Sequence, residues 1–250
     1  MRRALLLAGL ALILGGCSVP SWLKPAPTPI LPPDELYSQG EQEMSLRRYD
    51  KARESFKKIV ERHPNTSYAP RARFLLGEAY YREGEFDKAI KEFETFLSFY
   101  PRHQIADLVQ YRLATSYYDQ LKPVEQDQGL TAKAMEQFRR LVKTYPESRY
   151  ATDALAKVDI CRSRLAQKEV WVAGYYFNLG NPGAARQRLE LVLKEYPRTP
   201  VIPETLYTLA EVNFSEGRSQ EGWDLMRQVA TDYPWSDWGK RAQQRLRVQK

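Results

Sequence analysis

Residues 76–101 decide the fold, and they read LGEAYYREGEFDKAIKEFETFLSFYP. Within them, the small residue Ala89 is followed by Phe93 four positions later and by Phe96 seven positions later. That spacing places all three side chains on one face of an α-helix. Gly84 lies in a polar stretch typical of a turn. The segment therefore predicts two helices that approach each other closely and end at Pro101.

The same spacing recurs five times along the chain. Counting back 12 positions from the prolines at 64, 101, 146, 197 and 234 gives a small residue each time, and counting back 8 or 5 gives a large apolar one. A second small residue stands 24 positions before four of these prolines, and in the third copy an insertion of eight residues displaces it. The small residues are Ala52, Ala89, Ala134, Ala185 and Gly222, and, in the second set, Gly40, Gly77, Ala114, Ala173 and Ala210. Periodicity on this scale predicts a repeat protein.

The second copy resembles the tetratricopeptide pattern, because Leu76-Gly77, Tyr80, Ala89, Phe93 and Pro101 all match it. We therefore expect an all-α, tetratricopeptide-like α-solenoid of five helix pairs with a C-terminal capping helix, spanning residues 34–250. The interval from Pro146 to Ala173 is 27 residues where the others are 13, which predicts one long helix over about 149–177. Residues 120–130 are expected to form a loop, and residues 236–248 the capping helix. Hydroxyl residues at 66, 67, 148, 199 and 236 are expected to cap the helices that follow them.

The N-terminus has the pattern of a secreted lipoprotein. Residues 1–16 combine two arginines, an apolar run and two glycines, which is typical of a signal peptide and too short to cross a bilayer. Leu14-Gly15-Gly16-Cys17 resembles a bacterial lipobox, so Cys17 is expected to carry the lipid anchor. Six prolines follow by position 33, which predicts an extended tether over residues 17–33.

The composition favours binding over catalysis. The net charge is +7, without runs of Lys or Arg interleaved with aromatics, so no nucleic acid is expected. The two histidines have no metal-ligand spacing and no nearby nucleophile, and no phosphate-binding loop is present. We expect no enzyme activity, no cofactor and no metal. Cys161 is expected to be a buried apolar residue rather than a reactive thiol.

The repeats instead predict a binding groove. In stacked helix pairs the first helix of each pair lines one surface, and positions three before and four after its small residue should point there. In the first three repeats these residues are Tyr37, Met44, Phe74, Tyr81, Tyr111 and Tyr118, with Arg71 and Arg82 on the same face. Such a surface suits an extended apolar peptide with a carboxylate. The alternative is that the aromatic rings pack one repeat on the next.

The lipobox, tether and repeats together resemble the lipoprotein family of the outer-membrane β-barrel assembly machinery. Segments 49–56, 145–151 and 164–169 carry the resemblance. It implies a location at the periplasmic face of the outer membrane and three kinds of partner: the POTRA region of the barrel subunit, accessory lipoproteins and unfolded outer-membrane proteins. Arg188 matches a family arginine in the docking surface for the barrel subunit. Alternatives are another periplasmic repeat lipoprotein, such as a secretin pilotin or a cell-division coordinator, and a peptidoglycan-processing factor.

Overall fold

The computed structural model describes residues 31–248, and within them the chain is helical with no β-strand. The expected all-α fold is confirmed for this part. The predicted signal peptide, Cys17 and nearly all of the tether lie outside the described residues. Helix α1 begins at Pro33, one residue inside the predicted tether, because proline is well tolerated at the first position of a helix.

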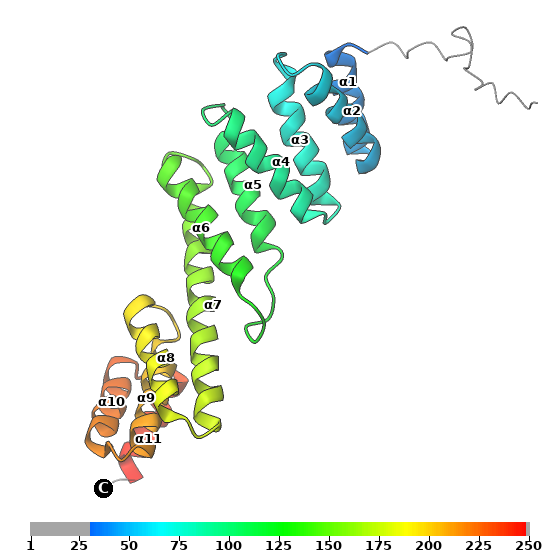
Figure 1. Cartoon of the computed structure of the whole chain (residues 1–250). Helices are drawn as coiled ribbons and strands as arrows, with labels where there is room; N and C mark the ends of the chain where they lie inside the picture. Colours follow the sequence, from blue (N-terminus) through cyan, green and yellow to red (C-terminus); the bar gives the residue numbers. More distant parts are fainter. Residues whose placement is uncertain (1–30, 249–250) are drawn as a thin grey trace, which may run out of the picture. The chain divides into compact units, whose positions relative to one another are not determined.

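Five helix pairs and a final helix follow one another along the chain (Figure 1). Each helix packs against the next in sequence. The pairs are α1 (Pro33–Ser45) with α2 (Tyr49–Arg62), α3 (Tyr68–Arg82) with α4 (Phe86–Phe99), α5 (Ala106–Tyr118) with α6 (Gly129–Thr144), α7 (Ala151–Asn178) with α8 (Pro182–Glu195), and α9 (Ile202–Ser215) with α10 (Ser219–Asp232). Helix α11 (Asp237–Val248) packs against both α9 and α10, as expected of a capping helix.

The recurring small and apolar positions form the core. All ten small residues are buried, and the large residues that follow them are fully buried: Phe56, Phe93, Phe138, Leu189 and Met226. Gly77 lies directly against Phe93, so that a Cβ added to the glycine would stand 2.6 Å from the ring carbon Cε1. The absence of a side chain there lets α3 and α4 approach closely, which explains why the spacing of small residues predicts the pairs.

Helix α7 has 28 residues and confirms the predicted long helix. Its first half contributes Val158 and Cys161 to the core shared with α6, and its second half contributes Ala166 and Ala173 to the core shared with α8 to α10. The long helix therefore belongs to two successive hydrophobic cores. Figure 1 shows it running beside α6 with its first half and beside α8 with its second. No helix among residues 31–248 is long and apolar enough to cross a membrane.

The expected helix caps are only partly correct. Ser236 does cap α11, because its hydroxyl accepts a hydrogen bond from the Gly239 amide at 2.9 Å. Thr66 and Thr199 instead donate backwards, to the carbonyls of His63 and Tyr196 at 2.8 and 2.9 Å, and Ser67 makes no capping bond. These threonines tighten the turn around the proline, so the prediction that they cap the following helix was wrong.

Candidate binding surfaces

The surface formed by the first helices of the first three repeats, which we call the first-helix face, carries the predicted groove residues on α1, α3 and α5. Five of its six apolar residues are half-buried. Their rings rest on the phenylalanines of the second helices, with centroids 6.0 Å apart for Tyr37 and Phe56 and 6.1 Å apart for Phe74 and Phe93. Tyr111 and Tyr118 both lie 6.0 Å from Phe138. Each ring therefore has one side on the core and one edge exposed.

Tyrosine hydroxyls on this face link one repeat to the next. Tyr81 on α3 donates to the Asp119 carboxylate at the end of α5, and Tyr111 on α5 donates to Asp153 on α7 at 2.5 Å. Burial, together with the bond to Asp119, raises the pKa of Tyr81 to about 12. Both hydroxyls consequently stay protonated as donors at neutral pH. The alternative that the aromatic residues pack one repeat on the next thus describes part of their role.

Three of the predicted groove residues differ in how far a ligand could contact them. Met44 is only 8% exposed and belongs to the core between α1 and α2, so it offers almost no surface to a ligand. Arg82 is bound within its own helix, where Nε lies 3.1 Å from Glu78 Oε1. Arg71 is exposed and forms no ion pair within residues 31–248. Of the two arginines, Arg71 is the one whose charge is open to a carboxylate.

A buried ion pair on this face was missed by sequence reasoning. Glu78 on α3 is 4% exposed, and its carboxylate is held by Arg112 on α5, with Nε 3.0 Å from Oε2. The Arg112 guanidinium also lies 5.3 Å from the centre of the Tyr81 ring. The two charges are 34 residues apart, and no local pattern indicates such a contact. The sequence therefore carries no signal for this ion pair.

Arg188 lies on α8, away from the first three repeats. Its side chain is 42% exposed, and its Nη1 is 3.0 Å from Glu169 Oε2 on α7. A pair with this exposure contributes little to stability, because water competes for both charges. The guanidinium is therefore open to exchange Glu169 for a carboxylate on another protein.

Cys161 faces the core rather than a surface. It is fully buried beside Ala114 and Phe138, and burial raises the pKa of its thiol to about 11. Because the thiolate is the reactive form, the side chain behaves as the apolar residue that the sequence predicted. Among residues 31–248 no group of three or more His, Cys, Asp or Glu is arranged to hold a metal ion.

Most of the chain, including these surfaces, matches the model of a known protein family. The family model described as YfiO, outer membrane lipoprotein, matches residues 30–224, which run from the start of α1 into α10. The chain belongs to this family. The match includes the first-helix face, the long helix α7 and Arg188, so the predicted resemblance to lipoproteins of barrel assembly is confirmed at the level of the family.

Curated relatives carry the name outer membrane protein assembly factor BamD. One from Rickettsia prowazekii is 29% identical over 94% of this chain and 92% of its own length. A second, from Caulobacter vibrioides, is 29% identical over 83% of this chain and 68% of its own. A third, from Neisseria meningitidis serogroup A, is 27% identical over 94% of this chain and 93% of its own length. The similarity thus extends over nearly the whole chain, and the relatives are named for assembling outer membrane proteins.

Proposed function

We propose that the chain is a scaffold of the outer-membrane barrel assembly complex that works by binding and not by catalysis. A lipid on Cys17 holds it at the periplasmic face of the outer membrane. It joins the POTRA region of the barrel subunit and receives the C-terminal segments of unfolded outer-membrane proteins. The observation that carries this proposal is the family match over residues 30–224, together with relatives that are named assembly factors.

The first-helix face is the proposed site for the unfolded substrate. Tyr81, Tyr111 and Tyr118 present exposed edges along α3 and α5, and aromatic rings give large contact areas at a small entropic cost. Arg71 supplies a charge with no ion pair in the described part of the chain. An extended peptide with apolar residues and a terminal carboxylate matches this combination.

The region around Arg188 is the proposed docking surface for the barrel subunit. In the complex, an acidic side chain of the POTRA region would replace Glu169 on the guanidinium. The charge reversal Arg188→Glu should therefore weaken capture of the barrel subunit from detergent extracts by at least tenfold. Glu169→Gln should strengthen it, since the competing carboxylate is gone.

The pull-down has a matched control and a clear contrary outcome. Arg62→Glu reverses a charge on α2 that forms no ion pair within residues 31–248, and it should leave capture unchanged. Intact capture by Arg188→Glu would remove this docking surface. Enrichment of a secretin, in place of a POTRA-bearing barrel, would favour the alternative function of a pilotin.

A further inference from the structure

The second half of α7 presents a face that borders a long groove. Ile160, Arg164, Gln167, Trp171 and Tyr175 follow one another at intervals of four, three, four and four residues, which places them on one side of the helix. Two depressions run along this side and share Arg164, Gln167 and Glu204, so they form one continuous surface. We call it the α7 groove. It exists because α7 extends beyond α6, so that a loop at residues 123–125 and the start of α9 form its walls.

One end of the α7 groove is aromatic. Trp171 is 44% exposed and Tyr175 is 55% exposed, and their ring planes are 13° apart with centroids at 6.2 Å. Lys168 lies with Nζ 4.4 Å from the centre of the Trp171 ring, and it donates a hydrogen bond to the Glu125 carbonyl at 2.7 Å. The stacked pair is thus held in place beside a fixed loop while its outer surface stays exposed. Large exposed rings in a groove are typical of a site for another chain.

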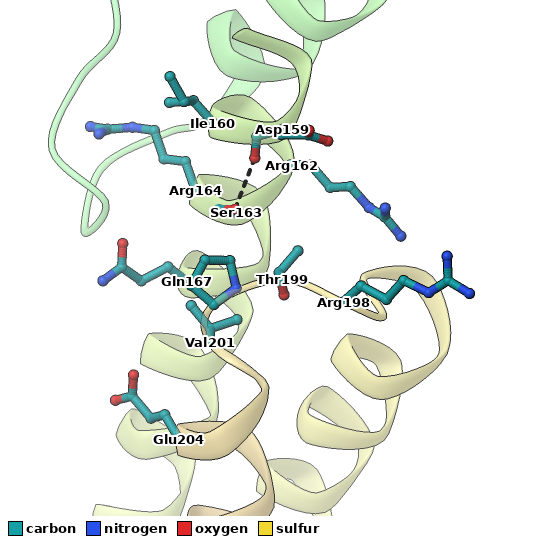
Figure 2. Close-up of a pocket in the computed structure, with 11 residues that line it drawn as sticks. Asp159, Ile160, Arg162, Ser163, Arg164, Gln167, Arg198, Thr199, Val201 and Glu204 are labelled. Atoms are coloured by element: carbon teal, nitrogen blue, oxygen red, sulfur yellow. Dashed lines mark hydrogen bonds between the residues drawn. The ribbon is translucent and has the colours of Figure 1, made fainter. Parts of the chain in front are cut away.

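The other end is a notch that contains three arginines (Figure 2). Arg162 and Arg198 extend on one side of α7, and Arg164 extends on the other. Arg162 and Arg164 donate to neutral acceptors, among them the carbonyls of Glu195 and Lys122, and Arg198 has no hydrogen bond or ion pair within residues 31–248. Two carboxylates, Asp159 and Glu204, line the notch without pairing with these arginines. Guanidinium groups without a carboxylate partner therefore flank the notch on both sides of α7, and its three arginines and two carboxylates leave one net positive charge.

The polar lining of the groove favours an extended chain over a helix. The side chains of Gln167, in the middle of the groove, and of Asn178 and Thr208, in the depression at its aromatic end, make no hydrogen bond within the described residues. Extended backbone needs such external partners, whereas a helix satisfies its own amides and carbonyls. The distance along α7 from Ile160 to Tyr175 is about 22 Å at 1.5 Å per residue. An extended segment covers that length with roughly seven residues.

We propose that the α7 groove binds an extended segment of a partner protein, about seven residues long, that carries carboxylates at one end and a proline or aromatic ring at the other. The carboxylates enter the arginine notch, and the ring stacks on the Trp171–Tyr175 pair. The side-chain amide of Gln167 binds the backbone between them. This site is separate from the first-helix face and from Arg188, so it holds or fails independently of the proposed function.

A labelled synthetic peptide tests the proposal on the full-length chain in detergent micelles. The probe has the sequence Glu-Glu-Ser-Gln-Ser-Pro-Trp-Pro, and its binding is followed by fluorescence anisotropy. Trp171→Ala and Arg198→Glu should each weaken binding about tenfold, and the affinity should fall as salt screens the notch. A peptide with glutamines in place of the glutamates should bind the wild-type chain about tenfold more weakly, with little further loss on Arg198→Glu.

Leu155→Ala is the matched control, because Leu155 also lies on α7 and is about as exposed as Trp171, at 50% against 44%, but does not line the groove. It should bind the peptide like the wild-type chain, and circular dichroism should show the same helicity for all variants. Unchanged binding in both Trp171→Ala and Arg198→Glu would overturn the proposal. So would a loss of self-association in Trp171→Ala without any loss of peptide binding, because the groove would then bind a second copy of the chain.

Discussion

The second and fifth repeats each bring a glycine against an aromatic ring, but the two residues lie on opposite helices and at different positions of the repeat. In the second repeat the glycine is on the first helix and the ring is on the second, as Gly77 and Phe93. In the fifth the ring is on the first helix and the glycine on the second, as Phe214 and Gly222, where an added Cβ would stand 2.5 Å from ring carbon Cε1. In these two repeats the close approach of the helices joins one ring to one residue without a side chain, and either helix can supply the glycine.

The two repeats differ in what surrounds the ring. Phe93 is fully buried, and the first-helix face above it carries Glu78 and its arginines. Phe214 is partly exposed and packs against Trp223, with ring centroids 4.7 Å apart. Tyr207, on the same helix, packs against Trp238 with ring centroids 5.0 Å apart. In the early repeats, by contrast, Tyr81 and Tyr111 donate hydrogen bonds to carboxylates. The N-terminal repeats are thus linked by hydrogen bonds from tyrosine to carboxylate. The fourth and fifth repeats are linked by the ion pair of Arg186 with Glu216, and the fifth repeat adds tryptophan packing.

The largest expected effect comes from removing the ring. Phe93→Ala should lower the free energy of unfolding by about 3–5 kcal/mol, because it leaves a cavity in a fully buried site. Phe214→Ala should cost about 2 kcal/mol, since that ring is already partly solvated. Urea unfolding followed by circular dichroism measures both. Equal losses would contradict the difference between the two repeats.

The buried ion pair should come next in size. Glu78→Gln removes the negative charge that holds Arg82 and Arg112, and it should cost about 2 kcal/mol. Glu61→Gln, at an exposed pair with Lys57, should change stability by less than about 0.5 kcal/mol. Hydrogen exchange should locate the loss in α3 to α5. A loss spread evenly into α9 and α10 would mean that the ion pair does not act locally.

The contact between glycine and ring can be tested by measuring whether substitutions at the two positions affect stability independently. Gly77→Ala should cost about 1 kcal/mol net, because the clash with Phe93 exceeds the gain in helix propensity. Phe93→Leu in the same chain should recover part of this loss, as should Phe214→Leu combined with Gly222→Ala. Gly174→Ala is the control: nothing lies within 4 Å of its added Cβ, so it should stabilise the chain slightly. Additive losses in both repeats would refute the proposed contact.

The smallest effect concerns the turns within the repeats. The residue 17 positions before the closing proline is Gly84, Gly180 or Gly217 in three repeats, each with φ between +72° and +80°. In the first repeat the same position is Arg47, at φ +58°. Because this conformation strains a residue with a side chain, Arg47→Gly should raise the free energy of unfolding by about 0.5 kcal/mol, after the larger backbone entropy of glycine in the unfolded chain offsets part of the gain. Thermal unfolding would show it, and a lower midpoint would contradict the strain.

The fold could be predicted because its determinants are local. The spacing of small residues fixes the helix pairs, and the interval of 27 residues before Ala173 fixes the length of α7. The candidate binding surfaces were harder to predict from the sequence, because their geometry depends on contacts between repeats. No local signal predicts that Glu78 meets Arg112 or that Tyr81 meets Asp119. The burial of Met44 was missed because its position on the helix also faces the neighbouring helix of its own pair.

The claim of two separate binding surfaces is tested most directly by one crossed titration. The double variant Tyr81→Ala/Tyr118→Ala and the single variant Arg188→Glu are each titrated, by calorimetry, with the purified POTRA region and with a peptide from the C-terminus of an outer-membrane barrel protein. The tyrosine variant should bind the peptide at least tenfold more weakly and the POTRA region normally, and Arg188→Glu should do the reverse. Equal losses for both ligands in either well-folded variant, or no loss in any combination, would contradict the account.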